Sequence, residues 1–311
     1  MRITNNMMLK NYLSNLNSNL TTLTDYQYKV ASGKNINKLS DDPIALISIM
    51  NSNVKLQKNA EYTDTVETAI AWLNQTDTSV YQMNEVIQSA YETLVKAVND
   101  SMAPEDKASS AAYIAQLRDQ AVTIANGQSG TKFLFGGYNV NNKPFVVDEN
   151  GKLLYNGYDL TDDTNPDLLA AEGEAITYEL GSGISMEISV TGVELMGKGE
   201  DNIYNVLDKL YHALMNDAPA DELGTYITKL QNCQHDVLTT DAKVGGMINR
   251  LTLLKNRYEE EDLTYREMKS NVEDVDLADA YTNYVMSMTV YNAALKVGTQ
   301  IIQASILDYL R

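Results

Sequence analysis

The feature that most constrains this chain is the seven-residue spacing of its apolar side chains, which recurs at both ends and in long tracts between them. In the first segment the steps alternate between four and three residues, through Leu9, Leu13, Leu16, Leu20, Leu23 and, one repeat later, Val30. This spacing predicts a helix with one narrow apolar stripe. Such a helix cannot bury its stripe alone, so we expect a partner helix.

The last segment, from about residue 276 to residue 311, repeats the pattern of the first. Further apolar residues flank its stripe, which is typical of a helix that contacts neighbours on several faces. We therefore expect the first helix to pair with the last. The predicted stripe comprises Leu277, Tyr281, Tyr284, Met288, Tyr291, Leu295, Gly298 and Ile302.

Two longer tracts predict a helical bundle between the ends. One covers residues 43–99, after a possible cap at Asp41 or Asp42, and the other follows Pro219. Shorter helices are predicted near residues 104–126 and 201–216, and we interpret all these stripes as intramolecular core. The two long stripes contain Ile70, Leu73, Val80, Ile87, Tyr91, Leu94 and Val98, and then Leu230, Cys233, Val237, Thr240, Val244, Met247, Leu251, Leu254 and Tyr258.

Between Gly127 and Gly199 the chain is rich in Gly, Asn, Asp and Thr, and its apolar runs are short. Residues 132–135, 152–155, 175–180 and 184–193 are predicted as strands, because apolar and polar residues alternate or flank turn residues. Asn156-Gly157 and Gly181-Ser182-Gly183 are typical of tight turns.

The predicted fold is therefore mainly α with a small β-rich insert. We expect the N- and C-terminal segments to form a long antiparallel helical bundle or coiled coil, with the middle β domain at its far end. The predicted domains are a terminal coiled-coil assembly domain (1–43 and 271–311), a helical bundle rod domain (44–135 and 200–270) and a variable β-rich outer domain (136–199).

Charge and cysteine content exclude several functions. The net charge of −18 repels phosphate backbones and anionic lipid, so we expect neither nucleic acid nor a membrane as a partner. A single cysteine, Cys233, allows no intrachain disulfide, and its place on an apolar stripe predicts a buried small hydrophobe.

No pattern of catalytic residues is present. His212 and His235 lie in different predicted helices, and the sequence has no HExxH, P-loop, GxGxxG or GxSxG motif. The acidic run 159–165 could bind Ca²⁺, but it lacks the EF-hand glycine and terminal glutamate, so a solvated loop is the better interpretation. We expect no catalytic residue, cofactor or metal, and a protein that is not an enzyme.

The first residues have neither a basic start nor an apolar core, so no cleaved secretory signal is expected. No apolar run is long enough to span a bilayer. These residues alone would favour a cytosolic protein.

Several short motifs nevertheless resemble the flagellar hook-associated protein 3 family, within the flagellin superfamily. The motifs occur in the family's order and cover essentially the whole chain. Flagellins proper usually have the sequence DDAAG where this chain has Asp41-Asp42-Pro43, so Pro43 favours the hook-associated family. The motifs are Ala31-Ser32-Gly33-Lys34 with Leu39-Ser40-Asp41-Asp42-Pro43; Phe133-Leu134-Phe135-Gly136-Gly137 with Asn142-Lys143-Pro144-Phe145; Leu154-Tyr155-Asn156-Gly157; Val244-Gly245-Gly246-Met247-Ile248-Asn249-Arg250-Leu251; and the ending 303–311.

The resemblance implies a structural subunit of the bacterial flagellum, located at the hook–filament junction. Family members are secreted without a cleaved signal through the flagellar type III export channel, which revises the cytosolic prediction to extracellular. The implied partners are further copies in a ring, hook-associated protein 1, flagellin and a type III export chaperone.

We predict that assembly uses the two terminal stripes, which would be poorly ordered until copies pack together. The predicted interface residues are Leu13, Leu16, Leu20, Leu23, Val30, Leu277, Tyr284, Met288, Tyr291, Leu295 and Ile302. Alternatives are a flagellin filament subunit or, in a different class, a secreted coiled-coil adhesin or a hydrolase on a helical scaffold. No anchoring signal or catalytic constellation supports the latter two.

Overall fold

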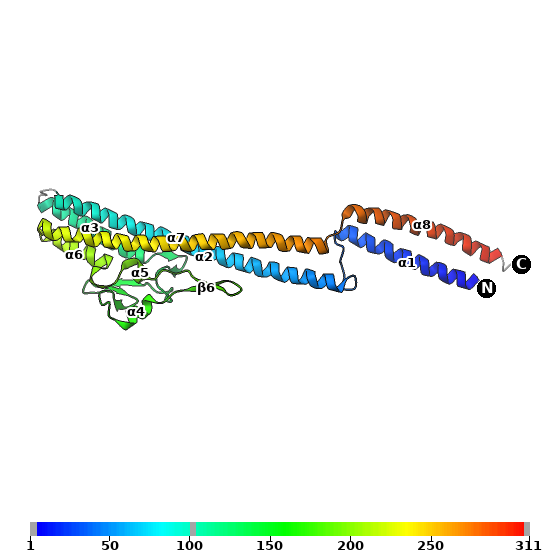
Figure 1. Cartoon of the computed structure of the whole chain (residues 1–311), viewed down its shortest axis with the longest axis horizontal. Helices are drawn as coiled ribbons and strands as arrows, with labels where there is room; N and C mark the ends of the chain where they lie inside the picture. The colour runs from blue at the N-terminus through cyan, green and yellow to red at the C-terminus, as the bar shows by residue number, and fades with distance from the viewer. Residues whose placement is uncertain (1–4, 100–103, 308–311) are drawn as a thin grey trace. The chain divides into compact units, whose positions relative to one another are not determined.

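The computed structural model of the chain describes residues 5–99 and 104–307 (Figure 1). The chain divides into two compact units, one formed by residues 1–60 and 260–311 and the other by residues 61–259. The mainly helical fold with a small β-rich insert is confirmed, and the predicted domain boundaries remain predictions.

Long helices dominate both units. Helices α2 (Pro43–Asn99) and α7 (Ala220–Glu273) each run through parts of both, and α3 (Pro104–Ala125) and α6 (Ile203–Met215) complete the bundle of the second unit. The carboxylate of Asp42 accepts hydrogen bonds from the backbone N–H groups of Ile44 and Ala45 at 2.9 and 3.0 Å. This N-cap satisfies donors that the helix itself cannot pair, as the sequence predicted.

The predicted stripes of the second unit form its core. Leu73, Val80, Ile87 and Leu94 of α2 are buried, and so are Leu230, Cys233, Val237, Val244 and Leu251 of α7. The stripe of α3 is buried against α6. Burial every three to four residues is what a 3.6-residue helical repeat requires of one packed face.

Polar contacts join α2 and α7 at several levels. The Gln234 side chain donates a hydrogen bond to Asn84 Oδ1 at 3.2 Å, and Lys255 Nζ lies 2.7 Å from Glu67 Oε1. The rings of Tyr62 and Tyr258 stack with centroids 5.9 Å apart. Low residue numbers of one helix meet high numbers of the other, so the two helices are antiparallel.

The β-rich segment between α3 and α6 contains three small antiparallel sheets. Strands β1 (Gln128–Ser129) and β2 (Lys132–Phe133) pair; β3 (Phe145–Val147), β4 (Leu153–Tyr155) and β5 (Tyr158–Asp159) follow in that order; and β6 (Thr177–Gly181) pairs with β7 (Ile184–Glu187). Asn156 and Gly157 have φ angles of 51° and 92°, which suits a two-residue hairpin turn. Ser182 and Gly183 join β6 to β7, with a φ angle of 75° at Gly183, so both predicted turns are confirmed.

Two short helices in this segment were not predicted. Helix α4 (Pro166–Glu172) begins after Asn165, whose side chain accepts a hydrogen bond from the N–H of Asp167. Helix α5 (Gly192–Met196) begins after the cap Thr191 and precedes a 3₁₀ turn, Gly199–Asp201. The predicted strand 184–193 was therefore wrong beyond Glu187, because a local cap outweighs the apolar run there.

A buried tyrosine ties the β-rich segment together. The Tyr155 hydroxyl donates to the carbonyl oxygen of Phe135 at 3.0 Å and accepts from the N–H of Gly192 at 3.4 Å. A Cβ at Gly192 would lie within 2.5 Å of the rings of Phe145 and Tyr155, so only glycine fits. Burial raises the pKa of Tyr155 to about 12.

The β6–β7 hairpin is anchored to α7 in a similar way. The Tyr258 hydroxyl donates a hydrogen bond to the carbonyl oxygen of Leu180 at 2.5 Å, and a Cβ at Gly181 would lie 2.3 Å from that hydroxyl. The seam of α7 therefore supplies both bundle core and support for the β-rich segment.

Candidate assembly surface

The terminal helices are α1 (Asn5–Ser32) and α8 (Leu277–Leu307), and their inner boundaries are encoded locally. Gly33 has a φ angle of 71°, and its N–H donates to the carbonyl oxygen of Lys29 at 2.9 Å. Glycine adopts this left-handed conformation without steric cost, so it ends α1. At the start of α8, the Asp276 carboxylate accepts from the N–H groups of Ala278 and Asp279 at 2.9 and 3.3 Å.

A short antiparallel contact holds these two boundaries together. The N–H of Asn35 donates to the carbonyl oxygen of Glu273 at 2.7 Å, and the N–H of Val275 donates to that of Gly33 at 3.0 Å. Lys34 Nζ lies 2.5 Å from Glu273 Oε1, and this hydrogen-bonded partner raises the pKa of Lys34. The end of α1 thus lies beside the start of α8, and the helices pack antiparallel along their lengths.

The closest approach of the two helices is at Tyr12. Its hydroxyl donates a hydrogen bond to the carbonyl oxygen of Ala294 at 3.1 Å. A Cβ at Gly298 would lie 2.0 Å from the hydroxyl oxygen, so the ring occupies space that any other residue at position 298 would fill. The predicted pairing of the first helix with the last is confirmed.

The predicted interface residues fall into two groups. Leu16, Leu23, Val30, Tyr284 and Tyr291 are partly buried in the pair. The second group lies on exposed faces, and between 40% and 55% of each side chain is accessible; it comprises Leu13, Leu20, Leu277, Met288 and Leu295. The side chain of Ile302 lies outside the described residues.

Small residues of α8 account for this division. Ala280, Ser287 and Ala294 recur every seven residues and are buried or partly buried, as is Gly298. Small side chains let two helix backbones approach closely. The pairing face of α8 therefore includes small residues as well as Tyr284 and Tyr291, and the larger apolar side chains are displaced outward. Counting only large apolar residues missed this signal, although its seven-residue period is visible in the sequence.

The pair consequently keeps an extensive outer apolar face, defined by its exposed large side chains. Large apolar side chains that stay exposed along two paired helices are typical of a surface that another molecule covers. The face consists of Met7, Met8, Leu9, Leu13 and Leu20 of α1 with Leu277, Tyr281, Val285, Met286, Met288, Val290, Leu295 and Val297 of α8.

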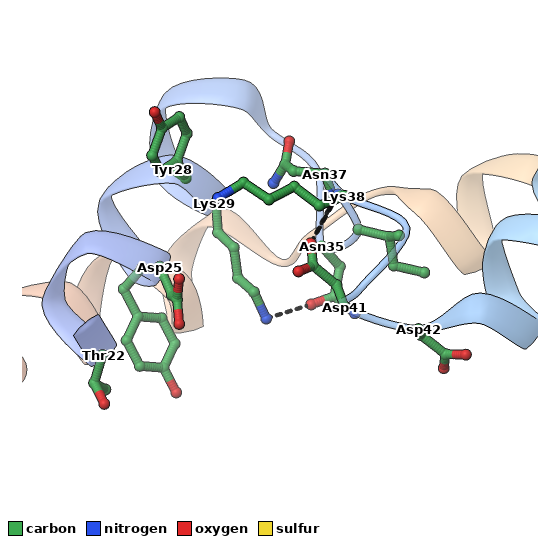
Figure 2. Close-up of a pocket in the computed structure, with 11 residues that line it drawn as sticks. Thr22, Asp25, Tyr28, Lys29, Asn35, Asn37, Lys38, Asp41 and Asp42 are labelled. Carbon is green, nitrogen blue, oxygen red and sulfur yellow. Dashed lines mark hydrogen bonds between the residues drawn. The ribbon is translucent and has the colours of Figure 1, made fainter. Parts of the chain in front are cut away.

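Beside the end of α1, the loop that leads to α2 encloses a polar hollow of about 470 Å³ (Figure 2). Lys29 Nζ donates to Asn35 Oδ1 at 2.8 Å, and Asp41 Oδ2 accepts from the N–H groups of Asn37 and Lys38 at 3.1 and 2.8 Å. These backbone hydrogen bonds lower the pKa of Asp41. The hollow is lined by groups that hold the loop.

Comparison with known proteins identifies this architecture. The model of the bacterial flagellin N-terminal helical region matches residues 3–140. Flagellar hook-associated protein 3 of Escherichia coli strain K12 is 26% identical over 322 aligned positions, which cover 96% of each chain. The protein of the same name from Salmonella typhimurium strain LT2 is 24% identical over the same shares. The chain is thus similar to flagellar hook-associated protein 3 along nearly its whole length.

Solved structures share the fold. A putative flagellar hook-associated protein from Vibrio parahaemolyticus superposes with a TM-score of 0.66 at 20% identity, covering 75% of this chain and all of that one. The flagellar junction protein FlgL from Legionella pneumophila has a TM-score of 0.58 at 11% identity, covering 74% of this chain and all of that one.

Both curated relatives are named flagellar hook-associated protein 3, and the Legionella structure is named a flagellar junction protein. Within residues 5–99 and 104–307, no cluster of three or more His, Cys, Asp or Glu side chains could hold a metal ion. In the acidic run, Asp159 pairs with Lys152 at 2.6 Å and Asp162 caps its own turn, so the run is a hydrogen-bonded loop. None of the helices in the described part of the chain is long and apolar enough to cross a membrane.

Proposed function

We propose that this chain acts as a hook-associated protein 3 and joins hook to filament by forming a ring whose subunits contact one another through the α1–α8 pair. The observation that carries this proposal is the outer apolar face of that pair. The face remains exposed although α1 and α8 already pack on each other.

The distribution of charge supports the same surface. Residues 1–33 and 276–311 contain five of the 24 lysines and arginines and four of the 42 aspartates and glutamates, which gives a net charge of +1. Residues 34–275 therefore carry −19. Copies can bring their terminal pairs together without the repulsion that their middle regions would cause, and depletion of charge is typical of interface cores.

Assembly then removes apolar surface from water, at about 25 cal/mol for each Å² covered. We propose that this gain offsets the entropy lost when the terminal helices become fully ordered, so free subunits stay soluble until they reach the junction. The proposed partners are neighbouring copies, hook-associated protein 1 on the hook side and flagellin on the filament side. An export chaperone would cover the C-terminal helix before type III secretion to the cell exterior.

Deletion of the gene tests the role. We expect bare hooks, with unpolymerised flagellin shed into the medium, and restoration of filaments by the full chain. Immunogold labelling of the restored flagella should mark one junction on each. Label along the whole filament would instead indicate a flagellin, label on the cell surface an adhesin, and normal filaments in the deletion strain would refute the proposal.

A further inference from the structure

The first three turns of α2 expose apolar side chains to solvent. Ile49 is buried on the inner face of this segment, whereas four apolar side chains on the outer face are between 53% and 81% exposed. These residues, called here the α2 stripe, are Ile44, Ile47, Met50 and Val54. Their spacing of three to four residues places them along one side of the helix.

The α2 stripe lies in a segment without charge. No residue from Pro43 to Val54 is ionisable, although charged residues make up 21% of the chain. A helix face that stays in water has no reason to avoid charge, and in this acidic protein charge on that face would keep copies apart. Exposure, apolar side chains and absence of charge together mark a surface that another protein covers.

The outer apolar face of α8 has the same character. None of the residues 280–295 is charged, and Tyr281, Val285, Met288 and Leu295 of this stretch are exposed. The α2 stripe extends for about 15 Å and the α8 stretch for about 20 Å, at 1.5 Å for each helical residue. Both surfaces belong to the unit formed by residues 1–60 and 260–311.

We propose that the α2 stripe of one copy packs against the outer apolar face of α8 of the next copy. A contact between two α2 stripes would be self-complementary and would end at a dimer. A ring subunit needs two different surfaces that match each other, which these two provide. This inference rests on the proposed self-assembly and adds which surfaces meet.

Disulfide trapping between two full-length chains tests the pairing. Cys233 is replaced by Ala in both, one chain carries Met50→Cys and the other, with a different tag, Met288→Cys. The chains are mixed in concentrated ammonium sulfate, which strengthens apolar burial, and are then oxidised. We expect more heterodimer, linked by a disulfide between positions 50 and 288, than random pairing of the two chains gives. Sedimentation shows in parallel whether the two variant chains self-associate as wild type does.

A charge in the stripe supplies a second measurement. Ile47→Glu should weaken self-association roughly a hundredfold, because a carboxylate would be buried without a partner. Leu253→Glu is the matched control, since Leu253 is 71% exposed on α7 in the other unit, and it should self-associate like wild type.

The possible failures are distinguishable. The pairing of these surfaces is wrong, and the proposed function stands, if wild type self-associates but the Met50→Cys chain cross-links chiefly to another copy of itself. The same conclusion follows if wild type self-associates and Ile47→Glu does so equally well. If wild type does not self-associate even in concentrated ammonium sulfate, the proposed self-assembly and the pairing of these surfaces are both wrong.

Discussion

Tyr12 of α1 covers Gly298 of α8, and its hydroxyl donates a hydrogen bond to the carbonyl oxygen of Ala294, one turn earlier, at 3.1 Å. This contact joins positions near the two ends of the chain. It makes Gly298 a point at which a single methyl group can separate the terminal helices.

Gly298→Ala should loosen the α1–α8 pair, since its Cβ would lie 2.0 Å from the Tyr12 hydroxyl oxygen. The ring must leave its place, and its hydrogen bond, with a net contribution of about 1 kcal/mol, is lost. We expect faster hydrogen exchange throughout α1 and α8. Gly245→Ala is the control: nothing lies within 4 Å of a Cβ there, and alanine favours the helix by about 1 kcal/mol. Equal exchange in both variants would contradict the contact.

Tyr155→Phe should destabilise the second unit by about 1–3 kcal/mol, because the carbonyl of Phe135 and the N–H of Gly192 lose a buried partner. The raised pKa adds a pH dependence. Folding keeps the hydroxyl protonated, so this stabilisation is full below pH 10 and is lost as the pH rises toward about 12. Urea titrations should show a smaller alkaline loss in Tyr155→Phe than in wild type. Tyr158→Phe, at an exposed position, should behave like wild type.

Cys233 should react with thiol reagents only when the bundle opens. It is buried, its thiol donates to the carbonyl oxygen of Asp201 at 3.5 Å, and burial raises its pKa from 9.0 to about 12. Thiolate is the reactive form, so we expect slow labelling at pH 8 that accelerates in denaturant. A Cys233→Ala, Leu238→Cys chain carries its thiol at an exposed position and should react at once. Rapid labelling of native Cys233 would contradict the packed seam.

Asp77→Asn should raise the melting temperature at pH 7. Partial burial, followed by the negative charge of Asp241 on the facing helix, raises the pKa of Asp77. A raised carboxyl pKa gives stability that is full below the ordinary value of 3.8 and is lost as the pH rises through the raised value. The advantage of Asp77→Asn should therefore shrink as the pH falls toward 3.8. Asp64→Asn removes the same charge at an exposed position and should show no such trend.

The long seams could be predicted from sequence because each large apolar residue has a definite helical phase. Val80, Ile87, Val237 and Val244 are buried where periodicity placed them. The rotation of α8 about its own axis could not be predicted from large apolar residues, because the small residues Ala280 and Ala294 lie on its pairing face. A short helix such as α4 depends on a single capping residue, and it is too short for a hydrophobic period to predict it.

The outward position of the α2 stripe could not be derived from periodicity either. A helix with apolar side chains at Ile44 and Ile47 suits a buried core as well as an interface with another chain. The sequence pattern predicted a buried core for this region. Only the structure shows that Ile49 occupies the inner face and leaves the others exposed.

The central claim is that copies assemble through the outer face of the α1–α8 pair, and a charged variant of that face tests it most directly. In the deletion strain, a Leu20→Glu, Met288→Glu chain should be exported and should keep Cys233 protected, yet be absent from purified hooks while flagellin is shed into the medium. Leu253→Glu should restore filaments. Normal filaments with the doubly charged chain at their junctions would contradict the account.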